Sequence, residues 1–306
     1  MNEIQRSVGF NITTSRLQFI EVEKVSDQIN ISNLGQSVVS PSINFEKKSE
    51  DEILLQLNSA FDELNLGNVA SNSTASFTLP PELFITLQLP YDNKLNHSEI
   101  TEEFRWELSQ LFPFIQSEDL AIKYYDLRKD FLQGENNALV VALNKKYLLL
   151  LKNFCAKNNM TPSLVDNASI TSNLFINTFF PVYNSTVAHI YNSKGLFTIF
   201  INLSSKPAFV KTLSKSEIDL TNLTSNKVFA DTLRLIRETK PDYSFISGEE
   251  MDVDLFSELQ SATGQSFIQY NPFDAVKFKP ELQPREVPAN LYTSFISATG
   301  IAARFN

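Results

Sequence analysis

Two periodicities in the order of hydrophobic and polar residues divide the chain into predicted strands and helices. Alternation at every second position predicts strands at 8–12 and 17–22, around a hairpin turn at 11–15. Apolar residues spaced three and four apart predict a helix at 50–66, which Gly67 ends. Further strands of the first half are expected at 29–39, 77–79, 84–89, 120–127, 138–144 and 164–166. Its further helices are expected at 98–112, 145–157 and 168–179.

The second half of the chain repeats this order of elements. It opens with three predicted strands, at 186–191, 196–202 and 208–213. The helices and strands expected after them are, in turn, 226–238, 243–247, 252–263, 266–269 and 289–303. Because each half opens with antiparallel-type strands and then alternates helix with strand, the sequence predicts two related α/β domains.

The helix at 98–112 has the clearest signals of all. Asn96 is suited to cap its first turn, because Glu99 follows three residues later and completes a capping box. Trp106 points away from the core-facing side, and Pro113 stops the helix. The predicted core-facing stripe consists of Ile100, Phe104, Leu108 and Leu111.

Composition narrows the class of protein. The 306 residues, 42% of them hydrophobic, can fill the cores of two domains. A net charge of −9 argues against nucleic acid, whose phosphates attract clustered basic side chains. Residues 1–15 lack the apolar segment of a signal peptide, and apolar runs such as 147–151 are far shorter than the roughly 20 residues of a membrane span. Cys155 is the only cysteine, so we expect no internal disulfide and a cytoplasmic location.

Several kinds of site are excluded by residue counts. One cysteine and two histidines, His97 and His189, cannot supply a Cys/His zinc cluster, and neither histidine lies near a nucleophile elbow. The closest glycines, Gly248 and Gly264, are sixteen residues apart, which rules out both a P-loop and a G-x-G-x-x-G turn. We therefore expect no metal and no cofactor.

Five segments, in this order and with these spacings, resemble the PilM family of type IV pilus assembly proteins, which is itself similar to the division protein FtsA. The segments are VGFNITTSRLQFIEV, ITEEFRWELSQLFPF, NNALVVALNKKYL, TPSLVDNASI and YSFISGEEMDVDLFSELQSATGQSFIQYNPF. The resemblance implies an α/β, actin-like (ribonuclease H-like) fold of two lobes. It also implies a 1C subdomain of the FtsA and PilM type.

The resemblance also implies a division into subdomains. Subdomain 1A would take residues 1–82 and return at 161–180, with subdomain 1C at 83–160. Subdomain 2A would take 181–306, including the last helix. The short connection at about 214–238 leaves room only for a vestigial 2B subdomain, which forms one wall of the nucleotide cleft in the family.

The phosphate and adenosine motifs of this fold are degenerate here. In the first hairpin, Asn11 replaces the family's Asp, Thr13 its Gly and Gln18 its Lys. Losing the acid and the base removes the metal–water contact and the charge clamp that phosphoryl transfer uses, and a side chain at 13 fills space that a phosphate needs.

The other two motifs have changed as well. Tyr191 stands in the second hairpin where Asp is expected, and Ser193 where Gly is expected. Only Gly248 of the adenosine-side glycine pair remains, followed by Glu249, whose carboxylate repels a triphosphate. We therefore expect a pseudo-ATPase with no catalytic residue.

By resemblance, the function is that of a non-catalytic scaffold or adaptor of a pilus or related secretion platform. It would bind the cytoplasmic tail of a PilN-like inner-membrane protein and be held at the membrane through its partners. The candidate partner-binding residues are Arg105, Trp106, Phe112 and Phe114.

Two other classes stay open. One is an actin-like ATPase with an atypical, glycine-poor nucleotide site. The other is the cytoplasmic domain of a GspL-type or FtsA-like protein, although those proteins continue into a membrane helix or a terminal amphipathic anchor, which we do not expect after Asn306.

Some residues allow more than one interpretation. Trp106 either packs between subdomains or contacts the partner directly. Phe112 and Phe114 are interpreted first as core residues and second as groove residues. His189 is expected to be a hydrogen-bonded core histidine, and Asp166, which matches an acid of the family, is expected to cap the helix at 168.

Overall fold

The computed structural model describes residues 4–66, 73–128, 136–180, 184–218, 223, 225–249, 253–280, 282 and 289–305. The chain forms two compact units. The first consists of Met1–Pro81, Lys146–Phe175 and Tyr270–Asn306, and the second of Glu82–Lys145 and Ile176–Gln269. The boundary at 175/176 falls inside the helix α4, Ala168–Phe179.

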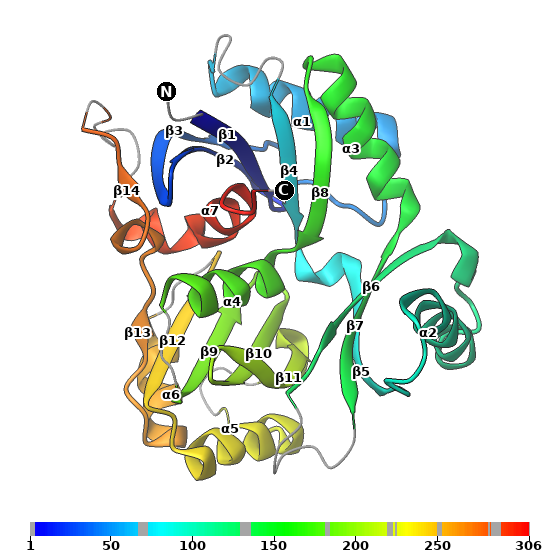
Figure 1. Ribbon diagram of the computed structural model, residues 1–306, viewed down its shortest axis with the longest axis vertical. Coiled ribbons are helices and arrows are strands. Elements are labelled where there is room, and N and C mark those ends of the chain that lie inside the picture. Colours follow the sequence, from blue (N-terminus) through cyan, green and yellow to red (C-terminus); the bar gives the residue numbers. More distant parts are fainter. Residues whose placement is uncertain are drawn as a thin grey trace. The chain divides into compact units, whose positions relative to one another are not determined.

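A six-stranded mixed sheet forms the centre of the first unit, in the order β14-β3-β2-β1-β4-β8 (Figure 1). The first three strands of the chain form an antiparallel meander, whereas β4 and β8 run parallel to β1. The strands are β1 (Ile4–Ile12), β2 (Arg16–Val25), β3 (Gln28–Val38), β4 (Thr74–Leu79), β8 (Thr161–Asn167) and β14 (Lys277–Phe278).

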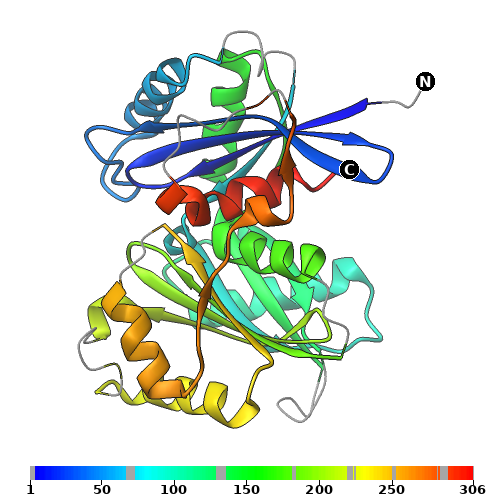
Figure 2. The same cartoon turned by 90° about the vertical axis from the view of Figure 1, so that its left-hand side faces the viewer.

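Helices cover both faces of this sheet (Figure 2). The helices α1 (Glu50–Glu63) and α3 (Lys145–Lys157) lie on one face. Phe10 of β1 is fully buried there, with its ring stacked on Phe77 at 5.3 Å and edge-on to Phe154 of α3 at 6.1 Å. Such a cluster removes a large apolar area from water and fixes the helices on the sheet.

The last helix of the chain lies on the opposite face of the first sheet. A 3-10 segment at Ala289–Phe295 leads into α7 (Ile296–Ala302), which packs on β1, β2 and β4. Gly9 makes this close approach possible, because a Cβ atom there would overlap the carbonyl oxygen of Ala298. This helix thus belongs to the first compact unit, whereas its assignment to subdomain 2A stays a prediction.

The second unit contains a five-stranded mixed sheet in the order β11-β10-β9-β12-β13. It repeats the β3-β2-β1-β4-β8 order of the first sheet, with an antiparallel meander followed by parallel strands. The strands are β9 (Thr186–Asn192), β10 (Leu196–Leu203), β11 (Lys206–Ser214), β12 (Tyr243–Gly248) and β13 (Ile268–Gln269). The predicted duplication into two α/β halves, each with its own sheet, is confirmed.

The helices α5 (Lys227–Thr239) and α6 (Val253–Thr263) pack on one face of the second sheet. Their apolar residues join those of β10 in one buried cluster, in which Phe197 stacks on Phe229 at 5.7 Å. Asn226 caps α5 by accepting the backbone N–H of Phe229. The connection from β11 to α5, where we predicted a vestigial 2B subdomain, lies partly outside the described residues.

A three-stranded antiparallel sheet, β5-β7-β6, belongs to the second unit and carries α2 (His97–Leu111). Its strands are β5 (Phe84–Pro90), β6 (Leu120–Asp126) and β7 (Asn137–Asn144). The predicted capping box is confirmed, since Asn96 accepts the N–H of Glu99 and the Glu99 carboxylate accepts the N–H of Asn96.

The core-facing stripe of α2 is one residue shorter than predicted. Ile100, Phe104 and Leu108 are buried against the three-stranded sheet, but Leu111 is half exposed. Phe114, interpreted as a core residue, is 99% exposed. Of the residues around the end of α2, Phe112 still packs against this core, whereas Leu111 and Phe114 do not.

The boundaries of the two compact units differ from the subdomain boundaries that the resemblance implies. Units are defined here by compactness alone, and the segment 83–160 is divided between them. The limits of subdomains 1A, 1C and 2A therefore stay predictions.

Candidate functional site

The turn between β1 and β2 is closed by its own threonine. The Oγ1 of Thr13 accepts the backbone N–H groups of Ser15 and Arg16, at 3.2 and 2.9 Å. The backbone N–H of Thr13 in turn donates to the carbonyl of Arg16 at 2.9 Å. Since Thr13 is only 1% exposed, the hydroxyl is fixed inside the turn. These three amide groups are therefore already hydrogen-bonded within the turn.

A chain of neutral amide and hydroxyl groups lies behind this turn. Asn11 donates to the Oε1 of Gln18 at 2.9 Å and accepts the hydroxyl of Thr78 at 2.9 Å. The Nε2 of Gln18 donates onward to Gln36 at 2.9 Å and to Ser294 at 2.7 Å. Asn11 and Gln18 are each 1% exposed. The two positions that would supply an acid and a base thus form one buried, uncharged network.

The turn between β9 and β10 is bound by the carboxylate of Glu82, a residue outside the hairpin. The hydroxyl of Ser193 donates to Oε1 of Glu82 at 2.6 Å, and the backbone N–H of Gly195 donates to the same oxygen at 2.8 Å. Ser193 also accepts the N–H of Leu196 at 3.0 Å. Glu82 begins the second unit, more than one hundred residues earlier in the chain, and no motif or periodicity around it singled it out.

The end of β12 is joined to the end of β9. Gly248 has a φ of +131°, and a Cβ atom there would overlap the backbone carbonyl of Asn192. The next residue, Glu249, donates its backbone N–H to that same carbonyl at 2.9 Å. Tyr191, one residue before Asn192, is 1% exposed. Gly248 is thus needed for a close backbone contact between the two strands.

Asp166 forms a buried ion pair that the sequence did not predict. Its Oδ2 lies 2.6 Å from Nη1 of Arg304, whose Nη2 donates to the hydroxyl of Thr171 at 3.1 Å. The carboxylate is 2% exposed. Asn167, not Asp166, caps α4, because its Oδ1 accepts the N–H of Ser169 at 2.9 Å. The charge of the acid that matches the family is therefore balanced by this chain's own arginine.

His189 is a core residue, as predicted. It is fully buried on β9, its Nε2 lies 2.8 Å from the hydroxyl of Ser247, and its ring stacks on Phe200 at 5.6 Å. Burial lowers the pKa of His189 to about 3, so the ring is neutral at pH 7. Cys155 is also fully buried, and burial raises the pKa of its thiol to about 12. Within the described part of the chain, no three His, Cys, Asp or Glu side chains lie close enough together to hold a metal ion.

The four candidate partner-binding residues differ in their exposure to solvent and in their contacts within the chain. The guanidinium of Arg105 donates to the backbone carbonyls of Ser117 and Leu120, which makes it a structural residue of α2. Phe112 is half-buried against the core of the three-stranded sheet. Trp106 is 60% exposed, so packing within the chain leaves most of its indole in solvent. Of these four candidates, Trp106 and Phe114 are therefore the two exposed aromatic groups.

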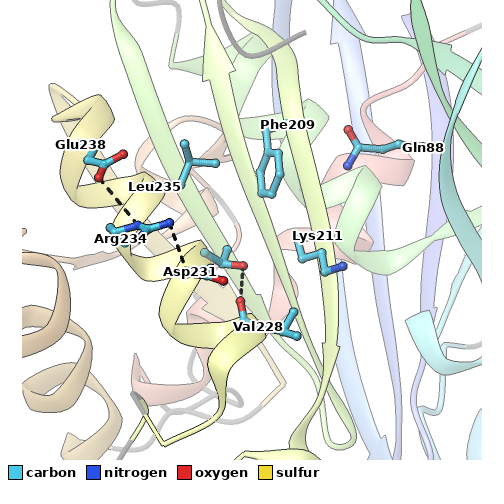
Figure 3. Close-up of a pocket in the computed structure, with 9 residues that line it drawn as sticks. Gln88, Phe209, Lys211, Val228, Asp231, Arg234, Leu235 and Glu238 are labelled. Atoms are coloured by element: carbon cyan, nitrogen blue, oxygen red, sulfur yellow. Dashed lines mark hydrogen bonds and ion pairs between the residues drawn. The ribbon is translucent and has the colours of Figure 1, made fainter.

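A pocket of about 430 Å³ lies between α5 and β11 in the second unit (Figure 3). The Arg234 side chain on its rim lies 3.3 Å from a carboxylate oxygen of Asp231 and 3.7 Å from one of Glu238. Gln88 of β5 donates to the backbone carbonyl of Val210 on β11. The lining residues are Gln88, Phe209, Lys211, Val228, Asp231, Thr232, Arg234, Leu235 and Glu238. None of them comes from either hairpin turn.

No family model matches this sequence, and no curated protein matches it. Among the described residues, no helix is both long enough and apolar enough to cross a membrane.

Solved structures nevertheless share the fold. A PilM–PilN type IV pilus biogenesis complex matches at 16% identity over 97% of both chains, with a TM-score of 0.71. A Bacteroides thetaiotaomicron protein of unknown function with an actin-like ATPase fold matches at 14% identity over 89% of this chain and 93% of that one, with a TM-score of 0.55. The chain therefore has the actin-like ATPase fold, and its predicted likeness to PilM is confirmed in the fold.

Proposed function

We propose that this protein is a non-catalytic adaptor of a type IV pilus or related secretion platform. It works in the cytoplasm, where it binds the cytoplasmic tail of a PilN-like protein of the inner membrane. It needs no bound nucleotide to do so. The observation that carries the proposal is that a chain with the fold of PilM uses its own side chains to accept the N–H groups of Ser15, Arg16 and Gly195 in its two hairpin turns.

The contacts at the turns argue against an ATPase. A phosphate held by a turn needs free N–H groups, but those of Ser15, Arg16 and Gly195 already donate to side-chain oxygens. Phosphoryl transfer also needs charged groups for the metal and the phosphates. Asn11 and Gln18 are neutral, and Asp166 is paired with Arg304. The alternative of an atypical nucleotide site would require these contacts to break.

The choice of partner rests on the fold likeness. PilM has been solved in a PilM–PilN complex, and the present chain matches it over nearly its whole length. For this chain the PilN-like partner is an inference. A short tail can bind a folded domain by placing apolar side chains against exposed aromatic groups, together with main-chain hydrogen bonds.

Trp106 and Phe114 are the groups on which we expect the tail to pack. Their exposed fractions, 60% and 99%, are high for aromatic side chains. Tryptophan is among the residues that most often dominate the binding energy of an interface, and its truncation costs about 2 kcal/mol or more. Trp106→Ala should therefore weaken binding about thirtyfold.

The test uses a labelled peptide with the sequence of the PilN-like tail from the same organism. Its fluorescence anisotropy gives the dissociation constant for the wild type, for Trp106→Ala and for Leu55→Ala. Leu55 is a matched control, because it is a large apolar residue of α1 that is 69% exposed. We expect the loss only in Trp106→Ala, with an unchanged melting temperature.

The possible failures are distinguishable. If the wild type does not bind the tail, the adaptor function is wrong. If the wild type binds and a normally folded Trp106→Ala binds equally well, the adaptor function stands but this face of α2 is not the docking site. A melting temperature lowered by several degrees in Trp106→Ala would show that the indole supports the fold instead.

A further inference from the structure

We propose that the β9–β10 turn is an oxyanion site and that the protein's own Glu82 is its resident ligand. The carboxylate blocks the turn against free anions such as inorganic phosphate. Without the Glu82 carboxylate, the β9–β10 turn should bind phosphate. The inference goes beyond the adaptor function: both use the contacts of Glu82 with Ser193 and Gly195, but the present inference concerns phosphate and its test involves no partner protein.

Two donors converge on one oxygen atom of Glu82. The hydroxyl of Ser193 lies 2.6 Å from Oε1, and the backbone nitrogen of Gly195 lies 2.8 Å from it. Hydrogen bonds to a charged acceptor are shorter and stronger than those between neutral groups, and both distances are in that short range. A hydroxyl and an amide that point at one anionic oxygen form a small oxyanion-binding nest.

The backbone around this nest is shaped to admit the carboxylate. A Cβ atom on Gly195 would lie 3.0 Å from the same Oε1 and 3.3 Å from Cγ of Glu82. A larger residue at 195 would therefore push the carboxylate away. The carbonyl of Gly195 accepts the N–H of Lys215 at 2.9 Å, and the backbone N–H of Ser193 donates to the carbonyl of Leu196 at 3.0 Å. These bonds hold both donors in place whether or not Glu82 is present.

Glu82 reaches the turn from a fixed position. It lies in the short 3-10 turn Pro81–Leu83, between β4 and β5. Pro81 is buried and β5 is paired with β7, so the backbone on both sides of Glu82 is anchored. A ligand tethered in this way has a high effective concentration at its site, which a free anion in solution must exceed.

A free phosphate cannot share the site with Glu82. One phosphate oxygen would need the same Ser193 hydroxyl and Gly195 N–H that Oε1 already uses. The two anions would also repel each other at close range. The first turn differs, because Thr13, a residue of the turn itself, accepts its N–H groups.

The experiment follows the backbone amide signal of Gly195 by nuclear magnetic resonance while inorganic phosphate is added. The wild type, Glu82→Ala and Glu103→Ala are compared in the full chain, with sodium chloride of matched ionic strength as the salt control. Glu103 is a suitable control because it is an exposed carboxylate of the same unit, on α2. Both variants lose one negative charge.

We expect phosphate to move the Gly195 signal in Glu82→Ala only, with a dissociation constant on the order of 10 mM, since two hydrogen bonds supply little affinity. Glu82→Ala should also melt about 2–4 °C below the wild type and recover part of this loss in phosphate. A Gly195 signal that phosphate leaves unmoved in folded Glu82→Ala would overturn the proposal. Equal movement in the wild type would overturn it too, because Glu82 would then not block the turn.

A second variant keeps the proposal testable if Glu82→Ala does not fold. Glu82→Gln preserves the length of the side chain and one carbonyl acceptor but removes the charge. We expect phosphate to compete with this neutral ligand and to move the Gly195 signal, more weakly than in the alanine variant. If phosphate leaves the Glu82→Gln variant and the wild type equally unaffected, charge does not make Glu82 the ligand and the proposal fails.

Discussion

The two hairpin turns occupy equivalent places in two sheets of the same strand order, yet they are closed by different means. The β1–β2 turn is closed by Thr13, whose hydroxyl accepts the N–H groups two and three residues further on. The β9–β10 turn is closed by Glu82, which lies more than one hundred residues away in the chain. Both turns have a hydroxyl residue, Thr13 or Ser193, where the resemblance to PilM led us to expect a glycine.

The first turn is thus stabilised by a contact within the hairpin, and the second by a contact with a residue far away in the sequence. A side chain that satisfies its own turn needs no other part of the fold, so its effect stays within the hairpin. A carboxylate from a distant segment couples the turn to the position of that segment. The strands beneath the turns differ too, because β1 carries the neutral Asn11 network and β9 carries the titratable His189.

The largest expected effect comes from restoring the acid in the first hairpin. In Asn11→Asp a carboxylate would face the Oε1 of Gln18, and turning that amide round would break its bonds to Gln36 and Ser294. A buried charge with one hydroxyl donor should cost about 3 kcal/mol of unfolding free energy at pH 7. The cost should shrink towards pH 4, because burial raises the pKa of a carboxyl group and the new side chain becomes neutral.

Urea unfolding at both pH values measures this cost, with Asn33→Asp on the half-exposed strand β3 as the control. If Asn11→Asp were as stable as the wild type at pH 7, the network would be able to accommodate a charged side chain. The first turn would then have kept a place for an acid.

The next largest effect is a loss of unfolding free energy at low pH, which comes from His189 in the second sheet. The pKa of His189 is about 3 in the folded protein, but about 6.5 in an unfolded chain. Between these values only the unfolded chain takes up the proton, so stability is full above pH 6.5 and falls as the pH drops towards 3. At pH 5 the loss from this one residue should be about 2 kcal/mol.

His189→Gln should remove that part of the pH dependence while leaving a polar group beside Ser247. Unfolding free energies of both proteins at pH 7 and pH 5 give the comparison. The same decrease in both proteins would show that other groups account for the whole acid sensitivity.

A smaller effect tests the long-range closure itself. Glu82→Ala and Ser193→Ala should be non-additive by about 1 kcal/mol, because each removes the same hydrogen bond. Glu82→Ala and Thr13→Ala should be additive, since those residues lie in different units and share no contact that closes a turn. Additive effects in both pairs would mean that the hydrogen bond between Ser193 and Glu82 contributes nothing to stability.

The sequence predicted what local periodicity and capping can specify. The hairpins, the repeated order of elements in the two halves and the capped helix α2 all follow from patterns of a few residues, whereas the strand order within each sheet was not predicted. The departures at the hairpin positions were inferred from the resemblance to PilM, and their effect on nucleotide binding stays a prediction.

The residues that complete these sites could not be predicted. Glu82 binds Ser193, which lies 111 residues away in the sequence, and Arg304 binds Asp166, which lies 138 residues away. Nothing in the neighbouring sequence marks either of them, since single charged residues are common on any surface. The exposure of Leu111 and Phe114 was missed for a related reason, because periodicity gives the face of a helix but not where the sheet beneath it ends.

We propose that the two turns do not bind nucleotide, and isothermal titration of the purified protein with ATP and Mg²⁺ tests this most directly. We predict no saturable heat at millimolar ATP and no release of phosphate over hours. A micromolar dissociation constant for ATP or ADP would contradict the account, because a nucleotide would then have displaced the contacts made by Thr13 and Glu82.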